Sequence, residues 1–219
     1  MVTYKEVSSN EEIKNYIRQA DATLGSMGFT EHSFAHVTRT AVVAQNILAD
    51  LGYDERTIEL TKIAGFMHDI GNVNNRLGHA HSGAIMAFRL LDKMGMDSAE
   101  IAQVVSAIGN HDEHTAHPVN AIAAALIIAD KIDVRRSRVR NRNIPTFDIH
   151  DRVNYSVTQS ALKVDTENRT MTLVLSVDTE FSSLASYFEI FLDRMLLCRK
   201  AANFFEYDFH LNINDIDMM

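Results

Sequence analysis

Cysteine is nearly absent from this chain, since Cys198 is the only one among 219 residues. A single cysteine allows no intrachain disulfide, and it excludes the thiolate-rich structural zinc sites as well. Proline and glycine are also scarce, with two and nine residues, while 46% of the residues are hydrophobic. This composition is typical of a globular, largely helical protein. A length of 219 residues predicts one large domain, or a domain with an appendage.

Long hydrophobic runs are missing too. The longest one, residues 121–129, is well short of the ~20 residues that cross a bilayer. The first residues, MVTYKEVSSNEE, have neither a basic start nor an apolar stretch, so they do not resemble a secretory signal. Together with the scarcity of cysteine, these features predict a cytosolic protein that has no membrane partner.

Positive charge is in short supply, and the net charge is −8. General nucleic-acid binding is therefore not expected, because it needs a basic face. The segment VRRSRVRNR, residues 134–142, is an exception with five arginines, and it predicts a local anion site. A solvated face whose arginines pair with acidic residues is the alternative interpretation. The GxGxxG and GxxxxGK[ST] nucleotide motifs are both absent.

The spacing of apolar residues predicts successive helices, followed by a part of mixed character. The expected helices cover residues 35–51, 56–70, 80–94, 98–110 and 119–131, with His68 and Asp69 in the last turn of the second. Branched residues then predict a β-hairpin with strands at 160–164 and 171–177, a long helix from 184 and a final strand at 209–213. We therefore predict a mainly α protein, with a helical domain over residues 1–145 and a small C-terminal α+β appendage over residues 146–219.

Several histidines and aspartates lie in, or at the end of, apolar runs, where an unpaired imidazole or carboxylate is costly to bury. A shared metal ion would satisfy all of them. They are His36, His68, Asp69, His111 and Asp130. Because the chain has ten histidines, chance alone gives roughly one His-Asp pair, so the dipeptide by itself is a weak motif. The order of these residues and their apolar setting make the stronger signal.

In order and spacing, these residues resemble the HD superfamily of metal-dependent phosphohydrolases. The resemblance covers about residues 30–140 and rests on His36 in HVTRTAVVA, His68 and Asp69 in MHDIGN, His79 in HAHSGA, His111 in AIGNHDE and Asp130 in LIIADKID. It implies a helical domain in which His36, His68, Asp69 and Asp130 hold one divalent metal ion. His79 and His111 match the histidines that two-metal branches add. The run AI..H followed by IIADKID.RRSR looks most like bacterial dinucleoside-tetraphosphate hydrolases.

The chain also departs from the family pattern. Asn72 stands where many relatives have a lysine, so any phosphate or solvent contact of that lysine is in doubt. His81 lies two residues after His79, and either could be the ligand, although His79 keeps the four-residue spacing to Gly83. The C-terminal α+β part is not explained by the dinucleotide hydrolases.

Imidazoles and carboxylates suit one or two ions of Mn, Fe, Co, Ni or Zn better than Mg or Ca. Asp69 can bridge two ions with its two oxygens, and hydroxide generated by the metals would attack phosphorus. Lys131, Arg135 and Arg136 are the candidates for binding the phosphate and stabilising its charge, with Asp69 and Lys131 as catalytic residues.

We therefore predict a phosphohydrolase that cleaves a phosphate ester or anhydride of a small substrate, by preference a nucleotide. A metal-binding regulatory or ligand-sensing module with little catalysis is the alternative, and the sequence leaves homo-oligomer formation open.

Overall fold

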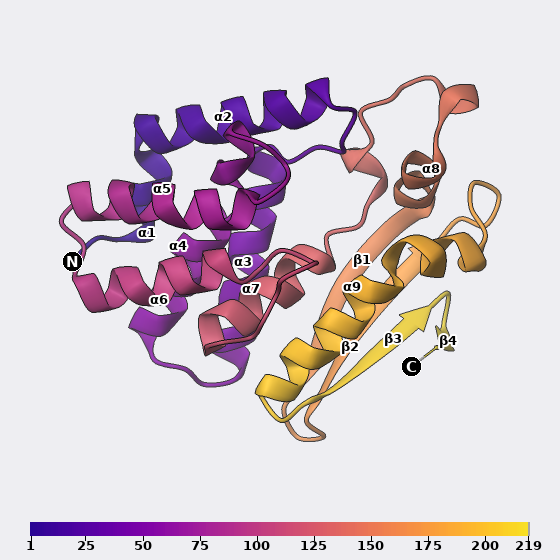
Figure 1. Ribbon diagram of the computed structural model, residues 1–219. Helices are drawn as coiled ribbons and strands as arrows, with labels where there is room; N and C mark the ends of the chain where they lie inside the picture. The colour runs from indigo at the N-terminus through magenta and orange to yellow at the C-terminus, as the bar shows by residue number, and fades with distance from the viewer. Residues whose placement is uncertain (219) are drawn as a thin grey trace.

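The computed structural model describes residues 1–218, and it confirms a mainly α protein with a small sheet near its C-terminus (Figure 1). The first part consists of the helices α1 (Tyr4–Ser9), α2 (Glu11–Ser26), α3 (Phe34–Asp50), α4 (Glu55–Met67), η1 (Ile70–Val73), α5 (His79–Lys93), α6 (Ser98–Gly109) and α7 (Ala121–Lys131). The second part consists of η2 (Arg136–Arg138), η3 (Ile144–Thr146), α8 (Ile149–Ser156), β1 (Val157–Asp165), β2 (Thr170–Val177), α9 (Leu184–Phe204), β3 (Asp208–Ile213) and β4 (Ile216–Asp217).

The helix that carries His68 ends earlier than the sequence predicts. α4 begins after Asp54, whose carboxylate accepts hydrogen bonds from the first backbone N–H groups, and it ends at Met67. His68 is its C-cap, and Asp69 precedes the 3-10 turn η1. A Cβ atom on Gly71 would lie 2.0 Å from the carbonyl oxygen of His79, so only glycine allows η1 to pack this closely against α5. This turn, rather than a continued helix, directs Asp69 toward α5.

α7 is the central helix of the molecule. Its residues 122–129 are all buried, which explains why the longest apolar run of the chain shows no polar face. Ile122, Ala123 and Leu126 pack into a core with α4, α5 and α6, while Ala124, Ile127 and Ile128 pack against the C-terminal part. The end of α7, with Asp130 and Lys131, therefore lies where the two parts meet.

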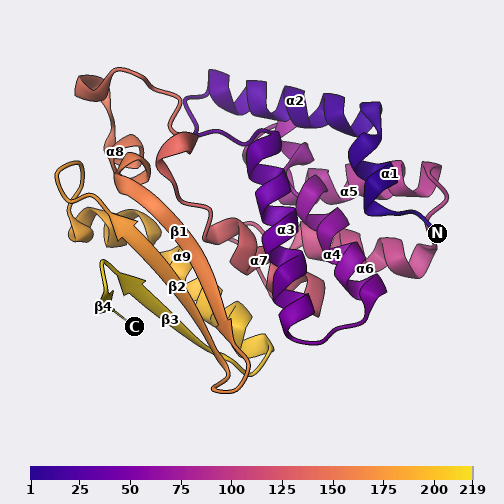
Figure 2. The same cartoon turned by 180° about the vertical axis from the view of Figure 1, so that it is seen from behind.

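The sheet has the strand order β1-β2-β3-β4. β1 and β2 form the predicted antiparallel hairpin, and β3 is the predicted final strand, which lies parallel to β2. A parallel pair needs a crossover connection, and α9 provides it. α9 covers one face of the sheet (Figures 1 and 2). Paired residues of β2 and β3 are buried beneath it, namely Met171 with Phe209, Leu173 with Leu211 and Leu175 with Ile213.

The C-terminal part shares a hydrophobic core with α3 and α7. The two parts on either side of the predicted boundary between residues 145 and 146 are therefore packed against each other. That boundary stays a prediction. Within residues 1–218, no helix combines the length and apolar character needed to cross a membrane.

Candidate metal centre

Six polar side chains from five segments converge beside the end of α7. His36 comes from the middle of α3, His68 and Asp69 from the end of α4, and His79 from the first position of α5. His111 directly follows α6, and Asp130 lies near the end of α7. The four histidines and Asp69 are at most 4% exposed. The structure thus brings together all six residues that the sequence predicts as metal ligands.

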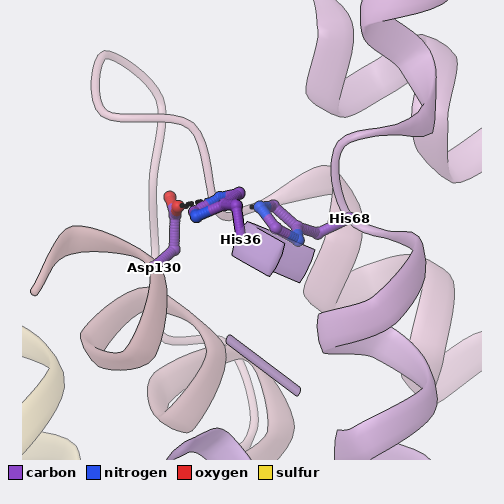
Figure 3. Close-up of side chains that lie close together, drawn as sticks. All are labelled: His36, His68 and Asp130. Atoms are coloured by element: carbon purple, nitrogen blue, oxygen red, sulfur yellow. Dashed lines mark ion pairs between the residues drawn. The ribbon is translucent and has the colours of Figure 1, made fainter. Parts of the chain in front are cut away.

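The first group of ligand atoms comes from His36, His68 and Asp130 (Figure 3). Oδ1 of Asp130 lies 3.2 Å from Nε2 of His36 and 3.6 Å from Nε2 of His68. Oδ2 of Asp69 completes the group, at 3.4 Å from Nε2 of His36 and 3.1 Å from Nε2 of His68. Two nitrogens and two carboxylate oxygens therefore surround one point.

The second group of ligand atoms comes from His79 and His111, whose Nε2 atoms are 3.1 Å apart. Oδ1 of Asp69 lies 3.6 Å from Nε2 of His79 and 4.0 Å from Nε2 of His111. The two oxygens of Asp69 thus face different groups, and this is the arrangement that a carboxylate bridging two ions requires. Ligand atoms of His68, Asp69 and His111 also lie within 4.8 Å of one another.

Hydrogen bonds orient each imidazole toward the centre. Nδ1 of His68 lies 2.8 Å from the carbonyl oxygen of Gly65, and Nδ1 of His79 lies 2.9 Å from the carbonyl oxygen of Arg76. Nδ1 of His111 lies 2.6 Å from the carbonyl oxygen of Ile108. A carbonyl oxygen only accepts, so Nδ1 donates in each case. When the ring is neutral, Nε2 then carries the lone pair that can bind a metal ion.

Several of the converging atoms lack a hydrogen-bond partner among residues 1–218. They are Nε2 of His36, Nε2 of His68 and Oδ2 of Asp69, all of which are buried. Leaving such atoms unsatisfied in the interior is costly, and a metal ion bound between them removes that cost. The donor set of imidazole nitrogens and carboxylate oxygens fits a divalent transition metal. The residues present therefore fit the predicted divalent metal ions.

The pKa values divide the histidines into two kinds. Burial lowers the pKa of His111 well below its usual range, with His68 and His79 adding to the effect, and burial also lowers the pKa of His79. Burial opposes protonation of His68 as well, but the nearby Asp69 and Asp130 raise its pKa to about 10. Without a metal ion, His68 therefore holds a proton at neutral pH, whereas His79 and His111 are neutral.

Asp133 is a residue that the sequence prediction missed. It is fully buried, and its Oδ2 accepts a hydrogen bond of 2.7 Å from Nδ1 of His36. Although burial would raise the pKa of Asp133, the hydrogen bond from His36 and the charge of Arg138 hold it well below the usual range. Asp133 thus orients His36. Its position one helical turn after Asp130 in IADKID is the signal that could have revealed it.

Asn72 takes the place of the lysine found in many relatives, and it contacts the proposed bridging carboxylate. Its Nδ2 donates to Oδ1 of Asp69 at 2.7 Å and to the backbone oxygen of Asp69 at 3.0 Å. Asn72 therefore fixes the orientation of Asp69. Of the two alternative histidines on α5, His79 points into the cluster, whereas His81 is exposed.

A cavity of about 260 Å³ opens beside the cluster, with Asp69 and Asp130 in its wall. Four cationic side chains also line it, namely Arg76, Lys131, Arg138 and Arg194. Of these, Lys131 is a predicted phosphate-binding residue, and it is 4% exposed and forms an ion pair with Asp130. Arg138 belongs to the arginine segment 134–142 that predicts a local anion site. Arg76 and Arg194 come from segments too far apart in the sequence for any spacing pattern to connect them.

The structure does not bring the other two predicted phosphate-binding residues to this cavity. The guanidinium group of Arg135 donates to Asp133, with 2.7 Å between Nε and Oδ1. Arg136 donates to the backbone oxygen of Tyr155 at 2.6 Å and lies over the ring of that residue. Neither lines the cavity. Pairing with acidic residues was the alternative interpretation of this arginine segment. It describes these two positions, because Arg135 pairs with Asp133 and Arg136 with Asp178.

Comparison with known proteins agrees with the geometry. The family model of the HD domain matches residues 33–139, a range that holds all six converging side chains. Residues 33–139 therefore match an HD domain. A crystal structure of a predicted HD superfamily hydrolase from an uncultured Thermotogales bacterium is also similar. The two chains are 29% identical over 57% of this chain and 68% of the other, with a TM-score of 0.45. A comparison with curated proteins finds no match.

Proposed function

We propose that this protein is a metal-dependent phosphohydrolase that cleaves a phosphate ester or anhydride, and that its substrate is a nucleotide. The HD domain match over residues 33–139 supports the hydrolase class. The observation that carries the proposal is the position of Asp69, whose two oxygens face two groups of ligand atoms in the wall of a cavity lined by four cations.

The metal ligands we propose are His36, His68, Asp69 and Asp130 for one ion, with His79, His111 and Asp69 for a second. A divalent transition-metal ion bound here would make water a nucleophile at neutral pH and would neutralise charge on the phosphoryl oxygens. Mn, Fe, Co, Ni and Zn all suit these ligands.

The chain's own residues then have distinct tasks. Asp133 and Asn72 hold His36 and Asp69 in position through hydrogen bonds of 2.7 Å each. Lys131 lies in the cavity wall next to Asp130, so its ammonium group can stabilise the negative charge that develops on a phosphoryl group. Arg138 is almost fully buried, and it donates to the backbone oxygens of Glu31 and Asp133. It therefore adds positive potential to the cavity from a fixed position.

The composition of the cavity wall supports the proposed substrate class. Beyond the cationic residues, the wall includes Phe29, Asn154, Asp148 and Asp151. An aromatic ring can stack on a base, and carboxylates can accept hydrogen bonds from ribose hydroxyl groups. These features favour a nucleotide over inorganic polyphosphate. The sequence likeness to dinucleoside-tetraphosphate hydrolases makes such dinucleotides one member of the substrate panel.

A panel of nucleoside monophosphates, dinucleoside polyphosphates, cyclic dinucleotides and alarmones, assayed with Mn, Fe, Co and Ni, tests the proposal. We expect phosphate or nucleotide release with at least one combination and none with Asp69→Ala. Inactivity across the whole panel, in protein that binds metal, would contradict the enzyme and favour a metal-containing sensing module. The Arg136→Gln variant is the matched control, because Arg136 lies outside the cavity.

A further inference from the structure

We propose that Arg194, on α9 of the C-terminal part, binds the phosphate group of the substrate. This inference rests on the proposed function of the cavity. It assigns a task to the C-terminal part that lies outside the matched HD domain of residues 33–139. The ligand class is a phosphate or phosphate ester bound next to the metal centre.

α9 reaches the cavity directly. It lies beside α7 (Figure 1), and its residues Phe191 and Arg194 line the same cavity as Asp69 and Asp130. These two residues are three positions apart on α9, so they share one face of the helix. The side chain of Arg194 is 26% exposed, which is consistent with a group at the wall of an open cavity.

The guanidinium group of Arg194 is held from one side only. Its Nε donates to both carboxylate oxygens of Glu113 at 3.0 Å, and its Cζ lies 4.6 Å from the centre of the Phe191 ring. Glu113 is the second residue after the proposed ligand His111. Within residues 1–218, the two terminal amino groups of Arg194 donate no hydrogen bond. A planar, fixed fork with free outer donors is suited to phosphate, which accepts two parallel hydrogen bonds from it.

Lys131 and Arg138 are more fully occupied than Arg194, and the one hydrogen-bond contact that the Arg76 side chain makes within residues 1–218 is with a proposed metal ligand. Lys131 forms an ion pair with Asp130, and Arg138 donates to backbone oxygens of two segments. Nη1 of Arg76 lies 3.3 Å from Nε2 of His79. Arg194 is therefore the cavity cation best placed to make new hydrogen bonds.

A purely structural ion pair between α9 and the loop after α6 is the competing explanation. If the pair only joined these segments, removing either partner would have the same effect. If Arg194 binds phosphate, its loss must weaken binding more than the loss of Glu113. The variants Arg194→Gln, Arg194→Lys and Glu113→Gln separate the two explanations. Arg199→Gln is the matched control, because Arg199 is exposed on the same helix and does not line the cavity.

Binding of inorganic phosphate to each variant, measured by calorimetry with and without Mn²⁺, is the main readout. Hydrolysis of p-nitrophenyl phosphate by the Mn²⁺-loaded protein gives KM and kcat. We expect Arg194→Gln to weaken phosphate binding and raise KM about tenfold or more, the effect of losing a charge-assisted bidentate contact. Arg194→Lys should recover part of the loss and Glu113→Gln should lose less, with Mn²⁺ content unchanged in all variants. Arg199→Gln should match the wild type.

Unchanged phosphate affinity in Arg194→Gln, an equal loss in Glu113→Gln, or loss of bound Mn²⁺ would overturn the inference. A wild-type protein that binds no phosphate would overturn it as well. If the wild type binds phosphate through Arg194 but hydrolyses nothing in the nucleotide panel, the proposed function fails and this inference stands. If the wild type is active and Arg194→Gln equals it in affinity and KM, only this inference fails.

Discussion

Replacing Asp133 by asparagine should weaken metal binding although Asp133 is not itself a proposed ligand. The carboxylate of Asp133 accepts the 2.7 Å hydrogen bond from Nδ1 of His36, and that bond fixes the ring and makes Nε2 a stronger donor to a metal ion. Asparagine keeps the size and one acceptor but removes the charge. Loss of such a carboxylate typically costs ~10–100-fold in metal affinity, or about 1.4–2.7 kcal/mol.

The same substitution should lower stability, because Asp133 also compensates buried and half-buried arginines. Its oxygens lie 3.0 Å from Nε of Arg39, 2.7 Å from Nε of Arg135 and 3.7 Å from Nη1 of Arg138. Removing one partner of a buried ion pair costs ~3–5 kcal/mol. The free energy of unfolding of the metal-free variant, obtained by urea titration, should therefore fall by an amount of that order.

Competition between the protein and a chromophoric chelator for Mn²⁺ or Co²⁺ gives the affinity, and circular dichroism verifies that the variant is folded at the temperature used. Asp178→Asn is the control. It removes the partner of Arg136, at 3.2 Å, without touching the cavity, so its metal affinity should equal that of the wild type. A folded Asp133→Asn protein with wild-type metal affinity would refute the proposed role of Asp133.

Three other predictions follow from single positions. A Cβ on Gly71 would lie 2.0 Å from the backbone oxygen of His79, so Gly71→Ala should lower the free energy of unfolding in urea by ~1–3 kcal/mol or more. Gly109→Ala should be tolerated, because the nearest atom to a Cβ there is 3.6 Å away. Equal stabilities of the two variants would contradict this prediction. Since the metal-free pKa of His68 is raised to about 10 from ~6.5 in unfolded chains, a bound metal must displace a proton. Metal affinity should therefore increase between pH 6.5 and 8.5, with proton release in calorimetry, and a pH-independent affinity would show that no proton is displaced. Burial raises the pKa of Cys198 to about 12, so Ellman's reagent should label the thiol only after unfolding; labelling of the native protein at pH 8 would contradict its burial.

Local patterns in the sequence were sufficient to predict α3 to α7, α9 and the hairpin, but not α1, α2 and α8. The six converging side chains were predicted from their apolar setting together with the family resemblance. The alternation of apolar and polar residues in β2 and β3 predicted which face of each strand is buried. The structure pairs the buried residues of the two strands, such as Leu173 with Leu211. Residue spacing also placed His36, His68 and Asp130 in one site, because the family pattern records their order.

What the sequence could not predict depends on contacts between distant segments. The end of α4 at Met67 results from the close packing of Gly71 against α5, which no helical periodicity encodes. Arg194 reaches the cavity only because α9 packs beside α7, a helix far from it in the sequence. Arg135 and Arg136 were chosen as phosphate ligands for their charge and their closeness to Asp130 in the sequence, whereas the structure gives them partners at Asp133 and Tyr155.

Elemental analysis of purified protein, reconstituted with Mn²⁺ or Fe²⁺ and freed of excess metal, tests the metal centre most directly. The arrangement of ligand atoms around both oxygens of Asp69 predicts about two ions per chain for the wild type and for Asp178→Asn, and a loss of bound metal in Asp69→Ala. Less than about half an equivalent in the reconstituted wild type, or a wild-type metal content in Asp69→Ala, would contradict the metal centre proposed for this protein.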